Sequence, residues 1–137
     1  MTRNSWIQCT YSHITYILDA YKRYVKETGA VFDNTTGLLR IDSDRYKKLK
    51  SLYFDIGGHI YEFNRNAQIW PRALNTLIGG EKDLVYLIVN DLGPDLSKNM
   101  GFIAGMTFLE RFYVVFDSGT YRVGLAKTQF TNSMNIN

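Results

Sequence analysis

The sequence has very little cysteine and no long apolar run. Its 137 residues include a single cysteine, Cys9, so no disulfide can form within the chain, and cysteine usage gives no sign of an oxidising compartment. No apolar run reaches the roughly 20 residues that a membrane-spanning helix needs. Near the N-terminus, Gln8, Thr10 and Ser12 interrupt the apolar residues, so the apolar core of a signal peptide is missing. We therefore expect no membrane partner, and the localisation of the protein stays unknown.

Charged residues are also scarce, and their signs nearly balance. They make up 21% of the chain, with 16 Lys and Arg against 13 Asp and Glu, and the formal net charge is +3. The only dense basic cluster contains Arg45, Lys47, Lys48 and Lys50. Four charges around one helical turn are more typical of a solvated helix face than of a nucleic-acid footprint. The charge pattern therefore indicates no nucleic-acid partner.

Apolar and aromatic residues are plentiful. Hydrophobic residues make up 45% of the chain and aromatic residues 15%, many of them in short runs with Val, Ile and Thr that favour strands. A chain of this length fits one domain with one core. Apolar residues keep helical spacing over residues 14–25, most securely from Asp19, and Gly29 should end that helix. The fold class indicated is mainly β, with about three short helical pieces.

Two hairpins and one buried strand follow from local patterns. The stretch "LYFDIGGHIYEF" predicts two strands joined by Gly57 and Gly58, and "YVVF" and "YRVGLA" predict a second hairpin around residues 117–120. Between them "LVYLIV", residues 84–89, is a continuous apolar run bounded by glycines and a proline. Such a run is typical of a strand that is buried on both faces.

A short helix is expected in "RIDSDRYKKLKSL", with Ser43 as its N-cap and basic residues toward its end. The nearby pair Asp42 and Asp44 has the residue types of a catalytic dyad. Capping and turn formation explain both carboxylates more simply.

Four stretches together resemble the C-terminal lobe of pepsin-like aspartic endopeptidases, in particular fungal acid proteases of the polyporopepsin type. They are "LYFDIGGHIYEF", "NAQIWPRALNTLIGG", "VYLIVNDLG" and "GFIAGMTFLERFYVVFDSGTYRVGLAKTQF", and the resemblance covers residues 19–130. It implies one antiparallel, barrel-like lobe with short helices, in which residues 15–137 form a partial C-terminal lobe and residues 1–14 a divergent segment. It also implies peptide or protein substrates, no cofactor and no metal, and proteins that are usually secreted or vacuolar.

The resemblance further implies a catalytic Asp-Thr-Gly loop from each lobe, because two carboxylates that share a proton can serve as base and acid together. One such loop should lie a short strand before residue 19, where this chain reads "CTYSHI". Cys9 then stands in place of the Asp and Tyr11 in place of the Gly. A thiol has an ordinary pKa near 8.5 and is neutral at acid pH, so it cannot replace a carboxylate. We expect no catalytic residue, and this chain alone should be inactive.

Two other functional hypotheses stay open at this point. The chain could be a peptide-binding or assembly module that a partner lobe or a homodimer completes. Alternatively, Cys9 and His13, four residues apart, could form a thiol nucleophile and its base, although no third group can be named.

The stretch "VFDNTTGLL" contains the residue types of the catalytic Asp-Thr-Gly loop, but in a different order. Asp33 and Gly37 are typical turn residues, so we interpret this stretch as a connecting turn. Asn34 begins an Asn-Thr-Thr glycosylation pattern. By resemblance, Leu92 and Ile103 would contribute to the wall of a substrate pocket, or else be buried apolar residues at strand ends.

Overall fold

The computed structural model describes residues 5–7, 14–91 and 103–135, and it describes side chains over residues 20–91 and 103–135. Cys9, Tyr11, His13 and Leu92, on which several sequence-based predictions rest, lie outside the described residues. The elements are β1 (Ser5–Ile7), α1 (Ile14–Thr28), β2 (Val31–Asp33), β3 (Leu38–Ile41), α2 (Ser43–Lys48), β4 (Leu52–Ile56), β5 (His59–Phe63), the 3-10 helix η1 (Arg72–Ile78), β6 (Val85–Leu87), α4 (Met106–Leu109), β7 (Phe112–Asp117) and β8 (Arg122–Lys127).

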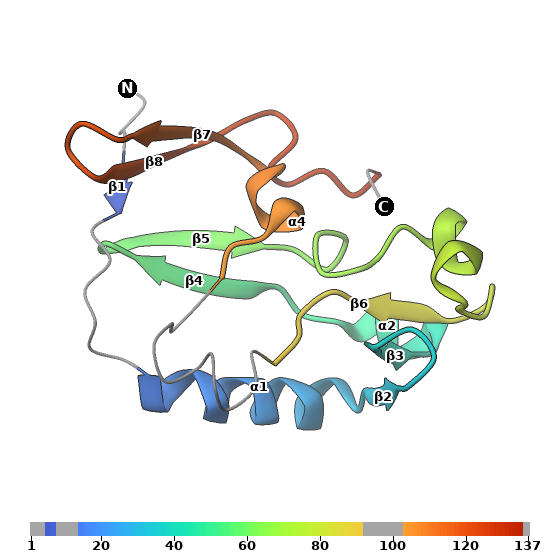
Figure 1. Ribbon diagram of the computed structural model, residues 1–137. Coiled ribbons are helices and arrows are strands. Elements are labelled where there is room, and N and C mark those ends of the chain that lie inside the picture. Colours follow the sequence, from blue (N-terminus) through green and yellow to red (C-terminus); the bar gives the residue numbers. More distant parts are fainter. Residues whose placement is uncertain (1–4, 8–13, 92–102, 136–137) are drawn as a thin grey trace.

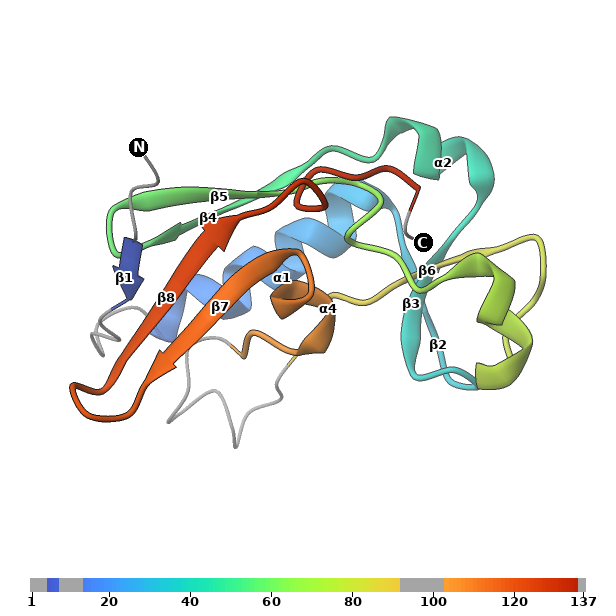
Figure 2. The ribbon, with the colours of Figure 1, turned by 90° about the horizontal axis from the view of Figure 1, so that it is seen from above.

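All strand pairs among the described residues are antiparallel. They form a sheet with the order β1-β8-β7, a sheet with the order β2-β3-β6, and the hairpin β4-β5. Helix α1 lies along one side of the β4-β5 hairpin and the β1-β8-β7 sheet lies on the other, while the β2-β3-β6 sheet sits at one end of the molecule (Figures 1 and 2). This mainly β, antiparallel arrangement with a few short helices confirms the fold class expected from the sequence.

Helix α1 buries one face and ends where glycine allows it. Tyr24 is buried, and Tyr21 and Val25 pack beside it against the strands. Its last residue, Thr28, donates its hydroxyl to the Tyr24 carbonyl at 2.8 Å, and Gly29 follows with a φ of 62°. A left-handed residue after a helix is strained for any side chain with a Cβ, so the predicted stop at Gly29 is confirmed.

Both predicted hairpins are present. In β4-β5 the turn is made by Gly57 and Gly58 with φ of 61° and 77°, which a two-residue turn of this twist requires. In β7-β8 the last cross-strand pair is Asp117 with Arg122, and Tyr121 adopts a φ of 53°.

Two local expectations need correction. The strand in the run of residues 84–89 is shorter than the run: only β6, residues 85–87, is paired, and all three of its residues are buried. The N-cap of α2 is Asp42 instead of Ser43, because the Asp42 Oδ1 accepts the backbone N–H of Arg45 at 2.8 Å. Ser43 is the first residue of the helix.

Among the residues whose side chains the structure describes, the buried apolar side chains form two clusters instead of the single core that the length suggests. The first joins α1 to the β2-β3-β6 sheet through Tyr24, Leu39, Ile41 and Leu87. The second lies between β5, α4 and the β7-β8 hairpin, where aromatic rings meet edge to face or tilted; it contains Tyr61, Phe63, Ala67, Phe108, Phe112 and Leu125. Leu52 packs against both clusters and therefore links them.

None of the helices in the described part of the chain combines the length and the apolar character that crossing a membrane would require.

Candidate functional site

The Asp33 carboxylate is used inside its own turn. Its Oδ1 accepts the backbone N–H of Thr35 at 3.2 Å, and its Oδ2 accepts the Thr36 hydroxyl at 2.9 Å. The Asp33 carbonyl accepts the N–H of Gly37 at 2.8 Å, and Gly37 has a φ of 71°. These bonds close the β2-β3 hairpin and confirm the turn interpretation. The hydrogen bond from Thr36 is the main reason why the pKa of Asp33 lies below its ordinary value.

A second loop has the residue order of the catalytic Asp-Thr-Gly motif, with Ser in place of Thr. It is Asp117-Ser118-Gly119-Thr120, for which the sequence pattern predicts only a hairpin turn. The Asp117 Oδ1 accepts the Thr120 N–H at 3.1 Å, and its Oδ2 accepts the Thr120 hydroxyl. Bonding by Thr120 lowers the pKa of Asp117, as Thr36 lowers that of Asp33.

The two loops cannot form a dyad with each other. The β2-β3 turn and the β7-β8 turn lie at opposite ends of the molecule in both views (Figures 1 and 2). Two carboxylates share a proton only when they are in direct contact. Asp33 and Asp117 are each an ionised turn residue at the surface.

Three other aspartates, Asp42, Asp44 and Asp55, also have local structural roles, because each makes a hydrogen bond or an ion pair within its own helix or turn. Asp42 caps α2 and lies 3.6 Å from the Arg45 guanidinium. Asp44 pairs with Lys47 at 2.9 Å, and Asp55 accepts the N–H of Gly58 at 3.1 Å in the β4-β5 turn. Asp42 therefore has a capping role, and Asp44 lies in the first turn of α2 as the sequence predicts.

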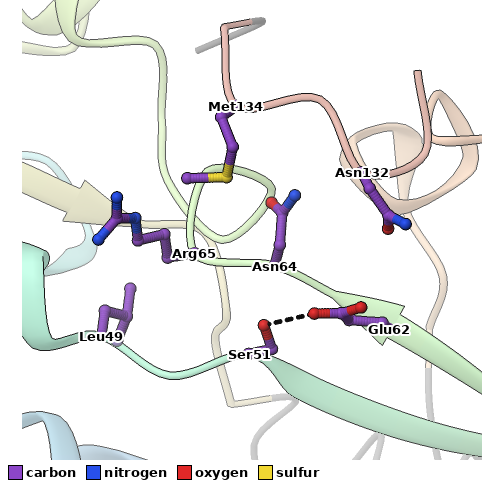
Figure 3. A pocket seen from close by; sticks show the side chains of 7 residues that line it. All are labelled: Leu49, Ser51, Glu62, Asn64, Arg65, Asn132 and Met134. Carbon is purple, nitrogen blue, oxygen red and sulfur yellow. Dashed lines mark hydrogen bonds between the residues drawn. The ribbon is translucent and has the colours of Figure 1, made fainter. Parts of the chain in front are cut away.

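One groove opens between the segment before β4, the end of β5 and the C-terminal tail (Figure 3). Its volume is about 330 Å³, and it is lined by Leu49, Ser51, Glu62, Asn64, Arg65, Asn132 and Met134. Ser51 donates its hydroxyl to the Glu62 Oε1 at 2.8 Å. Because the groove holds one carboxylate, it cannot supply the acid and base pair of an aspartic protease.

A second groove of about 390 Å³ holds two carboxylates. It is lined by Val31, Arg40, Ile41, Asp42, Arg45, Glu81 and Leu84. Each carboxylate faces a guanidinium: Glu81 pairs with Arg40 at 3.1 Å, and Asp42 with Arg45. Because each carboxylate is paired with its own guanidinium, the groove does not set two carboxylates against each other as a catalytic dyad requires.

A buried polar network was missed by sequence reasoning. Arg111 is fully buried, and it donates to the Ser133 carbonyl at 2.9 Å and to the Asn66 Oδ1 at 3.0 Å. The Thr131 hydroxyl donates to the Arg111 carbonyl at 2.5 Å. Burial lowers the pKa of Arg111 below its ordinary value. One arginine within the apolar stretch "TFLERFY" was the only sequence signal, and such a residue is usually exposed.

The remaining candidates are scattered. Ile103 precedes α4 and is 50% exposed, so the expectation of a buried strand-end residue is wrong, and it lines neither groove. Asn34 is exposed in the β2-β3 turn. Among the described residues, no three His, Cys, Asp or Glu side chains are grouped in a way that could hold a metal ion.

Comparison with known proteins places the chain in a family. The family model described as eukaryotic aspartyl protease matches residues 7–128, so part of the segment 1–14 lies inside the matched range. Polyporopepsin from Irpex lacteus is 56% identical over 115 residues, which are 84% of this chain and 34% of that protein. Pepsin A from Gallus gallus is 26% identical over 107 residues, which are 78% of this chain and 25% of that protein.

A solved structure agrees with this assignment. The crystal structure of aspartic proteinase from Irpex lacteus has a TM-score of 0.80 and 45% identity, and the match covers 97% of this chain and 44% of that one. The chain thus spans only about a third or less of the length of the curated relatives it matches. The family resemblance noted in the sequence is confirmed, and the chain belongs to the eukaryotic aspartyl protease family.

Proposed function

We propose that this chain is a non-catalytic portion of the C-terminal lobe of an aspartic protease, and that by itself it does not cleave peptides. One observation carries the proposal. Within the described residues, the loops of Asp33 and Asp117, whose residue types resemble the catalytic motif, are both hairpin turns, and each carboxylate accepts a hydrogen bond from a threonine of the same turn. The Asp33 carboxylate accepts two hydrogen bonds within its turn and the Asp117 carboxylate accepts three, so each is engaged in its own hairpin and neither faces a second carboxylate among the described residues that could complete an acid and base pair.

The sequence supports the same proposal. Where the family resemblance expects the Asp of the C-terminal lobe, the chain has Cys9, and where it expects the Gly, the chain has Tyr11. The first catalytic Asp and the covering flap belong to the other lobe in the family. The chain matches 44% of the solved relative, which is too little to contain two such lobes. Residues 15–137 are therefore assigned to a partial lobe, with residues 1–14 as a divergent segment.

The test is cleavage of an unfolded protein at acid pH by the purified chain, with and without a transition-state-analogue inhibitor of aspartic proteases. Pepsin A under the same conditions serves as the positive control. We expect no inhibitor-sensitive cleavage by the chain. Inhibitor-sensitive products above the background of a mock purification would overturn the proposal, whereas cleavage that a thiol reagent abolishes, and that is missing in Cys9→Ser, would support a thiol enzyme.

A second candidate is an assembly module that a second polypeptide completes, either a partner lobe or another copy. Apolar side chains on the outer face of the β1-β8-β7 sheet favour it. Tyr113 is 67% exposed and Val115 is 41% exposed, and they pair across the strands with Ala126 and Gly124, so they share one face. In addition, β7 is an edge strand in the described sheet and carries no Lys or Pro to discourage pairing.

Self-association is measured by light scattering across a dilution series. If the face containing Tyr113 mediates pairing of two copies, Tyr113→Lys should shift the chain toward the monomer. Tyr53→Lys is the matched control, because Tyr53 is similarly exposed, at 64%, on a different hairpin. Equal effects of the two substitutions, or a monomer at all concentrations, would remove the homodimer version of this candidate.

A further inference from the structure

We propose that Asn34 is an acceptor for an N-linked oligosaccharide. Asn34-Thr35-Thr36 is the one place in the 137 residues where Asn is followed, after one residue other than Pro, by Ser or Thr. A single short pattern carries little weight alone. The fold supplies the further observations, because it fixes whether the acceptor amide is accessible and whether a bulky group there would be tolerated.

Asn34 occupies the exposed corner of the β2-β3 turn. Its side chain is exposed, and within the described part of the chain its carboxamide makes no hydrogen bond. An asparagine that carries a glycan must lie at the surface of the folded protein, since the attached sugar is large and strongly hydrated. A glycan at this position would displace no side-chain hydrogen bond of Asn34 within residues 14–91 and 103–135.

The body of the protein holds the turn beyond Asn34. The Thr35 Cγ2 lies 3.2 Å from the place where a Cβ on Gly79 would be, so Thr35 lies beside the end of η1, although it is exposed. The Asn90 Nδ2 donates to the Gly37 carbonyl at 3.2 Å. With Gly37 held in this way, the exposed residues Asn34 and Thr35 form the solvent-facing corner of the turn.

The reaction needs a lipid-pyrophosphate-linked oligosaccharide as donor and a membrane-bound transferase as catalyst. The Asn34 Nδ2 forms a bond to C1 of the first sugar and loses one proton. The bond between C1 and the pyrophosphate oxygen breaks, and the lipid pyrophosphate leaves with that electron pair. No oxidant or reductant is involved.

The turn also sets when this transfer can occur. The transferase recognises the hydroxyl two residues after the acceptor, which here is that of Thr36. In the folded chain this hydroxyl donates to the Asp33 Oδ2 and accepts the N–H of Leu38 at 3.3 Å. Transfer should therefore take place before the β2-β3 hairpin closes, during synthesis, and the folded chain should be a poor acceptor.

The experiment is translation of the full chain, fused to a cleavable secretion leader, in the presence of microsomes, followed by protease protection. The protected chain should carry one glycan, which a peptide N-glycanase releases while converting Asn34 to Asp in the peptide mass spectrum. Asn34→Gln and Thr36→Ala should each remove the glycan completely. Thr35→Ala, which keeps the acceptor pattern, should be modified like the parent chain.

Folded chain offered afterwards to the solubilised transferase and donor should gain at least tenfold less glycan than the same chain kept unfolded in mild urea. A protected parent chain without any glycan, or a glycan that persists in Asn34→Gln, would overturn the proposal. Equal modification of folded and unfolded chain would overturn the assigned timing.

Discussion

Asp33 and Asp117 make the same pattern of hydrogen bonds in two different hairpins. In each, a carboxylate at the end of a strand accepts a backbone N–H and the hydroxyl of the threonine three residues later. The ionised carboxylate accepts these bonds better than the protonated form does, so the pKa of both groups is lowered in the folded protein. These hydrogen bonds are typical of a turn, although the residue types of both loops resemble the catalytic Asp-Thr-Gly motif.

A pH dependence of stability follows from the direction of these shifts. The stabilisation is fully present above the unfolded-state pKa of about 3.9, and it is lost as the pH falls through the lower folded-state pKa. We therefore expect the urea midpoint of the parent chain to fall more steeply below about pH 4 than that of an Asp33→Asn, Asp117→Asn double variant. Urea titrations at a series of pH values measure this.

The control for that comparison is Asp83→Asn, which changes an exposed aspartate in the turn before β6. The double variant should differ from the parent chain more than this control does. Parallel profiles for the parent chain and the double variant would mean that the two turns do not contribute to the pH dependence.

Arg111 gives a second prediction at the scale of the residue. In Arg111→Met the Asn66 Oδ1 and the partly buried Ser133 carbonyl, which also accepts the Asn64 Nδ2 at 3.4 Å, each lose a charged donor. We expect a loss of about 1–3 kcal/mol in the free energy of unfolding, the usual size for hydrogen bonds to a charged group. Chemical denaturation measures this loss.

Hydrogen exchange separates loss of the tail contact from a general effect. In Arg111→Met the amides of Thr131 and Ser133, which bond to the Thr128 and Phe130 carbonyls, should exchange faster while those of β4 and β5 change little. If the variant unfolds at the parent's denaturant concentration and these amides keep their rates, Arg111 does not hold the tail.

At the scale of elements, turns and hairpins were predictable because their signals are local. Gly57 and Gly58 alone fix the β4-β5 turn, and Gly29 fixes the end of α1. The N-cap of α2 lies one residue earlier than the sequence pattern predicts, because Asp42 and Ser43 are both good N-caps and the Asp42 side chain is the one that reaches the N–H of Arg45. The length of β6 depends on its neighbour β3, which no local pattern can show.

The connection from η1 to β6 is closely packed around Gly80. A Cβ at Gly80 would lie 2.6 Å from the ring of Tyr86, which is buried and accepts the N–H of Glu81 through its hydroxyl at 2.8 Å. We expect Gly80→Ala to destabilise the chain by about 1–3 kcal/mol, because overpacking forces buried groups to move. Thermal or urea unfolding measures this cost.

Gly105→Ala is the matched control, because no atom lies within 4 Å of the place where its Cβ would be. Its effect should be clearly smaller. Equal losses for the two variants would contradict the assigned role of the close contact between Gly80 and Tyr86.

At the scale of the molecule, the sequence is enough to recognise the family. It is not enough to predict how far the Asp33 turn lies from the Asp117 turn. The stretches around residues 52–63 and 101–130 carry enough specific residues to identify the lobe. The separation of the Asp33 and Asp117 turns follows only from how three small sheets pack around two clusters joined by Leu52. The Arg111 network likewise joins residues 66, 111 and 133, far apart in sequence.

The central claim is that this chain alone holds no catalytic pair of carboxylates, and inhibitor binding tests it most directly. A transition-state analogue of aspartic proteases binds to a formed dyad whether or not a substrate can be turned over. In a calorimetric titration of the purified chain at acid pH, with pepsin A as the positive control, we expect no saturable binding. Saturable binding, with one inhibitor for each chain or for each pair of chains, would contradict the claim.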